Sequence, residues 1–363
     1  MKIAFIYDVI YPYVKGGVEK RNYELAKELT KRGHEVHIFG MNYWRGKDII
    51  KKEGIWYHGV CKPQKLYKES NGKRSIKEPI HFSLKLFKPL IKEKFDIIDC
   101  SNIPYFPALT TRLVTLLKGE KMYITWHEVW GNYWFEYLGW KGFFGYTIEF
   151  LTQFLTKNNI AVSERTKKRL LFKEKCTLIT NGVNIFDIEN SKRAKKFFDV
   201  LFVGRLVNHK NVDLLISAVG EKYSLGIIGD GPERINLEKQ CLGRKNIHFL
   251  GSLEKQEEVY GYMKNTKVLA IPSTREGFGI VAIEANATGT PIVTVEGKDN
   301  AIVDLISSYK NGIVCKLDQE ELKKALELSF KKHSSMRKYS KIYAKRFSWN
   351  HLGTELEKVY GYE

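Results

Sequence analysis

Two glutamates flank a glycine-rich turn in the segment REGFGIVAIEANATGTPIV, which runs from Arg275 to Val293. Glu276 precedes the turn, and Glu284 lies in a run that is predicted to form a helix from near Gly279 to Gly289. The amino end of such a helix exposes backbone N–H groups that bind a diphosphate. Because carboxylates on either side of that anion would accept hydrogen bonds from sugar hydroxyls, the pattern favours binding of a phosphorylated sugar.

The same two acids also have a structural explanation. An acid near the start of a helix offsets the helix dipole, and an acid further along the helix can face solvent. Because Glu276 precedes the helix, its spacing from Glu284 does not by itself place both carboxylates on one helical face. Other segments of the chain must therefore decide between the two interpretations.

Two cations follow a predicted strand in FVGRLVNHKNVDLLISA, where Arg205 and Lys210 precede a predicted helix. Ligands of open α/β sheets bind at the carboxyl ends of the strands. Arginine offers a planar fork to phosphate oxygens, and lysine offers a mobile point charge. A pair of solvated surface cations is the alternative in a lysine-rich chain. The turn in IIGDGPER, Ile227–Arg234, is most simply a tight connection after another strand.

The elements that must position these residues alternate between strand and helix. KIAFIY, Lys2–Tyr7, is predicted to be a buried parallel strand, followed by a helix that ends near Gly33 and by a second strand. Further strands are expected at FDIIDCS, KMYITWH, NIAVS, CTLITNGV, FDVLFVG, YSLGIIGDG, NIHFLGS, TKVLAIPS and TPIVTV. The predicted fold class is α/β, with two Rossmann-like doubly wound domains. We place the first at residues 1–187, a polar linker near Asp187–Lys196, and the second at residues 197–344.

Composition excludes several classes of protein. Hydrophobic residues make up 43% of the chain and charged residues 28%, as in soluble globular proteins, and no apolar run is long enough to span a bilayer. The five cysteines are far apart and form no CxxC pair, so neither a zinc ribbon nor a disulfide scaffold is supported. The sequence therefore predicts a cytoplasmic protein, with the inner face of the membrane as an open alternative.

Positive charge is concentrated in the first half of the chain. The net charge is +19, and residues 1–195 contain 35 Lys and Arg against 20 Asp and Glu, a surplus of +15. A basic face of this kind suits nucleic acid, anionic lipid or a phosphorylated substrate, and the charge alone does not choose among them.

The motifs GRLVNHK, GDGP and EGFGIVAIE, in that order, resemble the C-terminal half of retaining glycosyltransferase family 4, whose signature is Glu, seven residues, Glu. KGGVEKRNYELAKELTKRGHEVHI and TWHEVWG are similar to segments of that family's N-terminal half. The resemblance covers nearly the whole chain and implies the GT-B architecture, in which two Rossmann-like domains face a central cleft. It also implies that a helix at about residues 345–363, opened by FSW, packs back on the first domain.

The resemblance implies a role for each matching residue. Glu284 would hold the ribose hydroxyls of a nucleotide-diphosphate sugar, and Arg205 with Lys210 would neutralise its diphosphate. The implied donor-binding set is Gly16, Gly17, Arg205, Lys210, Gly277, Phe278, Gly279, Ile280 and Glu284. The implied catalytic residues are Glu276, which would grip the transferred sugar, and His127, which would lie near that sugar and the incoming hydroxyl.

The histidines do not have the spacing of a metal-binding motif in the sequence. HEVWG lacks the second histidine of HExxH, and His34 and His37 follow strand alternation rather than the spacing of a metal pair. No Asp-x-Asp occurs, which argues against a cation-dependent transferase of the other common fold. We therefore predict no metal site and no required cofactor, with the nucleotide sugar as donor substrate. A hydrogen-bonded structural histidine is the alternative for His127.

An aromatic stretch, VWGNYWFEYLGWKGFFGYTIEFLTQFL, spans Val129–Leu155. Large aromatic side chains mostly pack in cores and interfaces, so an internal packing helix is the first interpretation. In the alternative interpretation, the aromatic side chains and the basic residues of the first domain together rest on the membrane surface. There they would meet an acceptor that is carried on a lipid.

These observations predict a retaining, hexosyltransferase-type enzyme that moves a sugar from a nucleotide-diphosphate sugar to a hydroxyl of a glycan or lipid-linked acceptor. A nucleotide-sugar epimerase or a phosphorylase of the same architecture is the alternative enzyme. A non-enzymatic basic binding protein is a further alternative, and nucleic acid is not an expected partner. The donor base and sugar, the acceptor and linkage, and the oligomeric state stay open.

Overall fold

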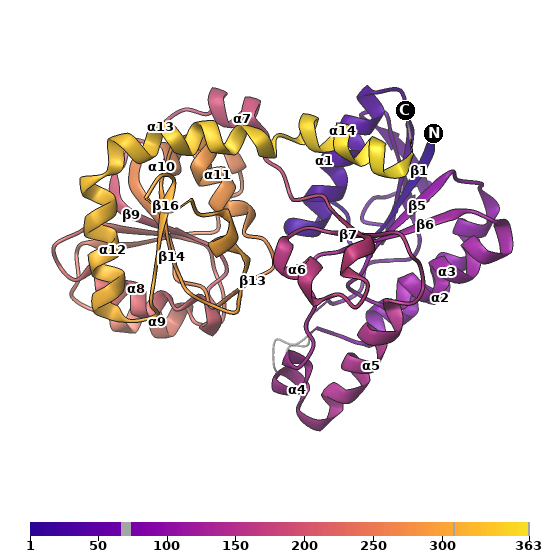
Figure 1. The fold of residues 1–363 in the computed structure, drawn as a ribbon, viewed down its shortest axis with the longest axis horizontal. Helices are drawn as coiled ribbons and strands as arrows, with labels where there is room; N and C mark the ends of the chain where they lie inside the picture. Colours follow the sequence, from indigo (N-terminus) through magenta and orange to yellow (C-terminus); the bar gives the residue numbers. More distant parts are fainter. Residues whose placement is uncertain (67–73, 308, 362–363) are drawn as a thin grey trace. The chain divides into compact units, whose positions relative to one another are not determined.

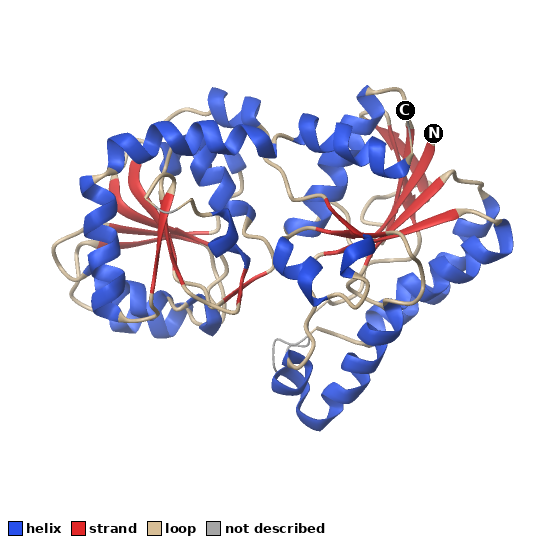
Figure 2. Cartoon of the chain, in the orientation of Figure 1, coloured by secondary structure: helices blue, strands red, loops and turns tan. Residues whose placement is uncertain are grey.

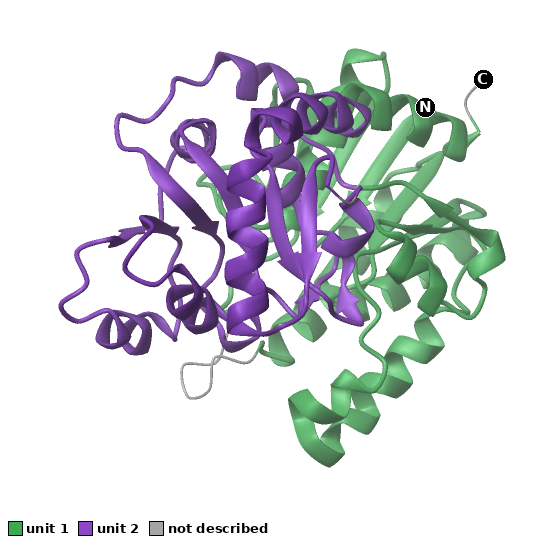
Figure 3. Ribbon diagram, turned by 60° about the vertical axis from the view of Figure 1, so that its left-hand side comes forward, with its two compact units in different colours: residues 1–180, 349–363 green, residues 181–348 purple. Residues whose placement is uncertain are grey.

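Buried strands and amphipathic helices alternate along the chain and build two sheets, each in its own unit. The computed structural model describes residues 1–66, 74–307 and 309–361. Unit 1 comprises Met1–Thr180 and the C-terminal segment from Trp349, and unit 2 comprises Asn181–Ser348 (Figure 3). In each unit, helices lie on both sides of a sheet of mainly parallel strands (Figure 2). The prediction of two α/β domains is confirmed.

Unit 1 contains an eight-stranded sheet with the order β3-β4-β2-β1-β5-β6-β7-β8. Its strands are β1 Lys2–Ile6, β2 Glu35–Gly40, β3 Ile49–Lys52, β4 Ile55–Gly59, β5 Ile97–Ser101, β6 Lys121–Trp126, β7 Asn159–Ala161 and β8 Cys176–Leu178. Its helices are α1 Gly17–Lys31, α2 Lys77–Lys92, α3 Phe106–Lys118, α4 Tyr133–Leu138, α5 Gly142–Thr152, α6 Glu164–Arg169 and α14 Trp349–Tyr360, with short 3₁₀ turns at η1 Gly139–Lys141 and η2 Lys173–Lys175.

Both faces of this sheet are buried, as the continuous apolar run of β1 predicts. Ala4 and Ile6 belong to the core cluster on the side that includes α2 and α3, whereas Ile3 and Phe5 belong to the cluster that includes α1 and α14. All strand pairs are parallel except β3 with β4. The chain turns from β1 to β2 on one side and later to β5 on the other, which makes the carboxyl ends of β1 and β5 the switch point of the sheet.

Unit 2 contains a six-stranded parallel sheet with the order β11-β10-β9-β12-β14-β16 and a separate pair, β13 with β15. Its strands are β9 Phe198–Val203, β10 Leu225–Ile228, β11 Ile247–Gly251, β12 Thr266–Ile271, β13 Arg275–Glu276, β14 Ile292–Val295, β15 Asp299–Asn300 and β16 Gly312–Cys315. Its helices are α7 Ile185–Asn190, α8 Val212–Val219, α9 Arg234–Gln240, α10 Gln256–Lys264, α11 Ile280–Thr288, α12 Gln319–Lys331 and α13 His333–Ala344, with 3₁₀ turns at η3 Asn208–Lys210, η4 Ala301–Leu305 and η5 Lys345–Phe347.

The core of unit 2 is also double-sided. Helix α12 contacts α8, while α10 and α13 contact α11. The chain first passes from β9 to β10 and β11, and then returns to the other side of β9 as β12. The switch point of this sheet therefore lies between β9 and β12, where an open α/β sheet binds its ligands.

Helix α14 completes unit 1, although it is the last element of the chain. It lies beside α1 (Figure 1), and its residues Leu352 and Leu356 belong to the core cluster on that side of the sheet. Tyr360 donates a hydrogen bond to the buried Asp99 carboxylate at 2.6 Å. The helix begins at Trp349, not at 345, because the 3₁₀ turn η5 occupies residues 345–347 and residue Ser348 is extended.

The predicted linker near Asp187–Lys196 is part of unit 2. The segment includes the end of α7, and its backbone is fixed on α10: Ala194 N–H donates to the Gly261 carbonyl at 3.0 Å, and Lys264 Nζ donates to the Ser191 carbonyl at 2.6 Å. Its polar composition reflects a surface position. The chain instead leaves unit 1 after Thr180 and returns after Ser348. Val183 and Ser348 pair as a parallel bridge within unit 2.

Candidate functional site

The predicted diphosphate site lies at the switch point of unit 2. The loop after β9 and the loop after β12 are joined by two hydrogen bonds: Thr274 N–H donates to the His209 carbonyl at 3.0 Å, and Asn211 Nδ2 donates to the Pro272 carbonyl at 2.8 Å. Because the two strands are parallel neighbours, their carboxyl ends meet at one edge of the sheet. The structure therefore brings the Arg205–Lys210 loop beside the turn that contains Glu276.

Lys210 forms an ion pair with Glu276. The Nζ atom of the lysine contacts Oε1 of the glutamate, and the two side chains are 16% and 15% exposed. Both groups are half-buried, so their attraction is screened less than that of a surface pair. Arg205, on the same loop, is exposed to solvent. Unit 2 thus places one predicted phosphate ligand directly against the acid predicted to grip the sugar.

The turn GFG leads into the amino end of α11. Gly279 is the N-cap residue with φ of 85°, a backbone conformation that favours glycine. An added Cβ at Gly279 would lie 2.3 Å from Ile302 Cγ1, so packing also requires glycine there. Phe278 is buried, whereas Gly277 and Ile280 are partly exposed. Ile280 and Val281 open α11, where the N–H groups of a helix start can receive an anion, while Ala282 N–H donates to the Gly279 carbonyl at 2.9 Å.

Glu284 lies in α11 and is 2% exposed. Its carboxylate accepts hydrogen bonds from Gln256 Nε2, at 3.3 Å to each oxygen, and from the Tyr260 hydroxyl at 3.2 Å. Gln256 and Tyr260 both lie on α10, one helical turn apart, and the sequence interpretation did not name them. No local pattern in the sequence points to them, because their contact with Glu284 depends on how α10 packs against α11.

The GDG turn after β10 holds the Arg205 loop in place. Gly204 N–H donates to the Ile228 carbonyl at 3.0 Å, and Leu206 N–H donates to the Asp230 carbonyl at 2.9 Å. An added Cβ at Gly229 would lie 1.9 Å from the carbonyl oxygen of Gly204. The turn is therefore a packing element of the site, and its glycine allows the two loops to approach closely.

The remaining predicted residues lie in unit 1. Gly16 and Gly17 are exposed at the amino end of α1, which follows the carboxyl end of β1. His127 directly follows β6 and is buried. Its backbone N–H donates to Asn102 Oδ1 at 2.9 Å, and its Nε2 lies 3.3 Å from Ser101 Oγ. Burial lowers the pKa of His127 to about 3, with a smaller contribution from Arg21, so the imidazole is neutral near pH 7.

A buried ionic cluster, which the sequence interpretation did not name, follows β1. Arg74 forms an ion pair with Asp8 and lies 3.7 Å from Glu78. Burial raises the pKa of Glu78 to about 8, and the Asp8 charge adds to the shift. Burial likewise raises the pKa of Glu19 to about 7. No sequence signal connects these four residues, because Arg74 and Glu78 are far from β1 along the chain.

The aromatic stretch of residues 129–155 divides into a buried side and an exposed side. Glu149 of α5 is buried, where it accepts hydrogen bonds from Trp130 N at 2.8 Å, Gly131 N at 2.7 Å and the Tyr105 hydroxyl at 2.7 Å. We define the exposed aromatic surface by these exposed side chains: Phe135, Trp140, Phe143, Phe144, Phe150, Phe154 and the neighbouring Phe172. Internal packing therefore explains only part of the stretch. Within the described residues, no helix combines the length and apolar character needed to cross a bilayer.

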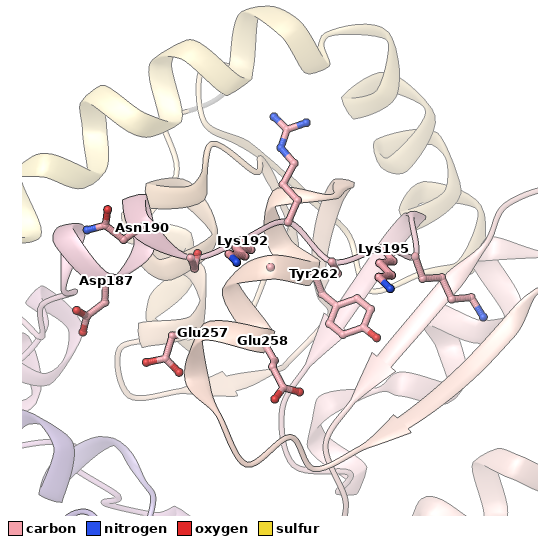
Figure 4. A pocket seen from close by; sticks show the side chains of 12 residues that line it. Asp187, Asn190, Lys192, Lys195, Glu257, Glu258 and Tyr262 are labelled. Atoms are coloured by element: carbon pink, nitrogen blue, oxygen red, sulfur yellow. The ribbon is translucent and has the colours of Figure 1, made fainter.

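A cavity of about 820 Å³ lies elsewhere in unit 2, between the segment after α7 and helix α10 (Figure 4). Lysines and glutamates, among them Lys192, Lys195, Glu257 and Glu258, line it together with Tyr262. The lining includes no residue that was predicted to bind the donor.

Two protein-family models match this chain, one on each half. The model for Glycosyltransferase Family 4 matches residues 15–185, and the model for Glycosyl transferases group 1 matches residues 184–347. The first match contains Gly16, Gly17 and His127, and the second contains all the predicted residues of unit 2.

Relatives of the chain include glycosyltransferases over nearly its whole length. An uncharacterised glycosyltransferase of Methanocaldococcus jannaschii is 27% identical, covering 97% of this chain and 96% of its own. The O-antigen chain mannosyltransferase C of Escherichia coli is 24% identical, covering 82% and 80%. The structure of Anabaena Alr3699/HepE, solved in complex with UDP and glucose, has a similar fold, with a TM-score of 0.76, 17% identity and coverage of 99% and 98%. With family models that together reach from residue 15 to residue 347, the chain belongs to the group 1 and family 4 glycosyltransferases.

Proposed function

We propose that this glycosyltransferase takes a hexose from a nucleoside-diphosphate sugar and transfers it to a hydroxyl of a glycan or lipid-linked acceptor, with retention of anomeric configuration. The observation that supports the donor most is the meeting of Lys210, Glu276 and the amino end of α11 at the switch point of unit 2. The relative from Anabaena was solved with UDP and glucose, which supports the same donor class.

The proposed division of roles follows from the chemistry of each group. Arg205, Lys210 and the amides from Gly277 to Ile280 would bind the diphosphate, where negative charge develops as the glycosidic bond breaks. Glu284 would accept hydrogen bonds from the ribose hydroxyls, and Glu276 from hydroxyls of the transferred sugar. Gln256 and Tyr260 would act as positioning residues, because they fix the Glu284 carboxylate.

The chemistry of Gly16, Gly17 and His127 likewise suggests a role for each of these residues of unit 1. Gly16 and Gly17 carry no side chain that would obstruct a diphosphate at the start of α1. The neutral imidazole of His127 would hydrogen-bond hydroxyls of the sugar or acceptor.

Retention would follow from a same-face displacement. The bond between the anomeric carbon and the phosphate oxygen breaks, and a bond from that carbon to the acceptor oxygen forms on the same face. The acceptor proton passes to the departing phosphate oxygen, so no separate carboxylate base is required. Exclusion of water would prevent hydrolysis of the donor.

A screen of nucleoside-diphosphate sugars for thermal stabilisation would identify the donor, since a ligand that binds only the folded state raises its apparent stability. Incubation of that donor with acceptor glycans should then release nucleoside diphosphate, and NMR of the product should show the donor's anomeric configuration. Conversion of the sugar without acceptor would indicate an epimerase. A requirement for free phosphate would indicate a phosphorylase.

A lipid-linked acceptor is supported by the exposed aromatic surface. Trp140 and Phe144 are 74% and 67% exposed, and the exposed Lys141, Lys173 and Lys175 lie beside the aromatic residues in the chain. Aromatic side chains insert at the headgroup level, and lysines attract anionic lipid. We therefore place unit 1 at the surface of an anionic membrane in this proposal, consistent with an acceptor that is carried there. Flotation with anionic vesicles tests this part separately from transfer.

A further inference from the structure

Three side chains that are distant in sequence meet at the edge of the unit 1 core. His37 comes from β2, His58 from β4, and Glu93 caps the end of α2. His37 Nδ1 lies 2.7 Å from His58 Nε2 and 3.7 Å from Glu93 Oε2. One ligand atom from each of the three residues lies within 4.8 Å of the others. Sequence alternation explained His37 as a strand residue, but the fold supplies two partners that alternation could not reveal.

The geometry needs only a small change to hold a metal ion. In a tetrahedral zinc site, with bonds of about 2.05 Å, two nitrogen ligands are roughly 3.3 Å apart. The two imidazole nitrogens would thus separate by about 0.6 Å from their present 2.7 Å, and the Glu93 oxygen would approach. Two imidazoles and one carboxylate form a donor set that Zn²⁺ accepts, with a fourth position left for water.

A second carboxylate orients the first imidazole. His37 Nε2 lies 2.8 Å from Glu35 Oε1, and because a carboxylate only accepts, Nε2 carries the proton. The lone pair of Nδ1 is then directed towards His58 and Glu93. A carboxylate behind a ligating histidine is the usual outer support of a zinc ligand. On metal binding, the His58 proton would move from Nε2 to Nδ1, which lies 3.9 Å from Glu93 Oε1.

The carboxylates around the three ligands favour a cation here, and one ligand is reachable from solvent. Lys2 Nζ lies 3.1 Å from Glu35 and 3.0 Å from Glu93, so one ammonium faces two carboxylates. One negative charge in this group is unmatched. Both histidine side chains are almost fully buried, whereas the Glu93 side chain is 28% exposed and leaves a route from solvent.

We propose that His37, His58 and Glu93 form a binding site for one divalent transition-metal ion, with Zn²⁺ the best match, and that Glu35 orients His37 behind it. The site lies near Lys2 and Glu35, the first residues of β1 and β2, and extends to His58 in the second half of β4. Ligands of the transfer reaction are expected at the carboxyl ends. The ion would therefore stabilise unit 1 by joining β2, β4 and α2, and would take no part in transfer.

Without metal, hydrogen bonds link His37 to His58 and to Glu35, and an ion pair links Lys2 to Glu93. This alternative predicts that Zn²⁺ does not bind and that stability does not depend on chelator. The two interpretations differ in metal stoichiometry, which can be measured on the full chain without any activity assay.

The experiment uses the full-length protein, stripped with chelator and titrated with Zn²⁺ by calorimetry, with metal content measured after dialysis. The wild type should bind one equivalent, and its Tm should rise until one equivalent is bound. Glu93→Gln and His58→Gln should weaken binding by at least tenfold, and Glu35→Gln by about tenfold to a hundredfold. His351→Gln, which removes an exposed histidine of α14, is the matched control and should bind as the wild type does.

Cobalt provides a readout that does not depend on a variant folding. Co²⁺ added to the stripped wild type should give the visible absorption bands of a four- or five-coordinate site, and one equivalent of Zn²⁺ should remove them. If His58→Gln does not fold, Glu93→Gln still tests the proposal, because the Glu93 side chain is partly exposed and its replacement should not prevent folding. A wild type that retains no metal after dialysis and gives no such bands overturns the proposal, as does equal binding by Glu93→Gln and the wild type.

Discussion

Lys210 and Glu276 form an ion pair across the junction between the β9 loop and strand β13. The two residues have different proposed ligands, the diphosphate for the lysine and the transferred sugar for the glutamate. If the proposed roles hold, donor binding exchanges this ion pair for contacts with the donor. Variants of the two residues should accordingly affect different parts of donor recognition.

Lys210→Met should lower the affinity for the nucleoside diphosphate by about tenfold or more, because it removes a charge-assisted contact. Glu276→Gln should bind the nucleoside diphosphate at least as well as the wild type, since Lys210 is released from its partner, yet it should transfer sugar poorly. Calorimetry with nucleoside diphosphate and with the intact donor separates the two effects. Equal loss of nucleoside diphosphate binding in both variants would contradict the division of roles.

Glu284→Gln should reduce discrimination for the ribose hydroxyls. A buried carboxylate that accepts from two hydroxyls loses much of that contact when it becomes an amide. The wild type should bind the nucleoside diphosphate about tenfold or more tightly than its 2′,3′-dideoxy analogue, and the variant should bind the two nearly equally. Tyr260→Phe should weaken this preference less, because Gln256 still holds the carboxylate. An unchanged preference in Glu284→Gln would remove the residue from the ribose site.

Replacing Trp140, Phe143 and Phe144 together with serine should reduce flotation with anionic vesicles. These side chains provide apolar area at the headgroup level, and their loss does not alter the buried Glu149 contacts that hold α5. Serine at Ile235, Leu242 and Ile342, which are equally exposed but lie in unit 2, is the matched control and should leave flotation unchanged. A wild type that stays in the soluble fraction contradicts the membrane proposal and leaves sugar transfer untouched.

His127 should make unit 1 less stable in acid. Its pKa is about 3 in the folded chain and about 6.5 when exposed, so the unfolded state binds the proton first as the pH falls. The contribution of His127 to stability is fully present above pH 6.5 and is lost as the pH falls towards 3, by up to about 1.4 kcal/mol per pH unit. His127→Gln should show a flatter acid limb than the wild type.

Tryptophan fluorescence measures this unfolding selectively, because all seven tryptophans lie in unit 1. The exposed His351 serves as control, and His351→Gln should keep the wild-type acid limb. Parallel acid limbs for the wild type and His127→Gln would show that His127 is not held neutral by burial.

Leu356→Ala should destabilise unit 1 by about 2 to 5 kcal/mol, the usual effect of emptying a fully buried leucine site. The fluorescence transition should move to lower denaturant concentration. Leu242→Ala, at an exposed site in unit 2, should leave it unchanged. Equal midpoints for Leu356→Ala and the wild type would mean that α14 contributes little to the unit 1 core.

The two domains could be predicted from sequence because strand and helix patterns alternate and most strands are short and apolar. Strand β16, by contrast, was missed because Gly312–Cys315 is a brief run between a turn and a charged helix. Strands β3 and β4 were also missed. Strand β3, Ile49–Lys52, is largely exposed and forms the antiparallel edge of the sheet. The final helix was expected to begin near residue 345, but the 3₁₀ turn η5 occupies residues 345–347 and α14 begins at Trp349.

The candidate site of unit 2 was predictable where glycines and charges share one local segment, as around Glu276. Gln256 and Tyr260 were not, because their contact with Glu284 depends on how α10 packs against α11. The same limit applies to Arg74 with Asp8, and to His37 with His58. In each case tertiary packing, rather than local pattern, creates the contact.

The place of α14 in the core of unit 1 has a consequence for how the protein is made. The ribosome synthesises residues 181–348 before it adds Trp349, Leu356 and Tyr360. Until then, one side of the unit 1 sheet is incompletely covered, and Asp99 lacks its hydrogen bond from Tyr360. Unit 2 is continuous in sequence and can close its own core as soon as it emerges. The half of the enzyme that is translated second is therefore the half that can finish folding first.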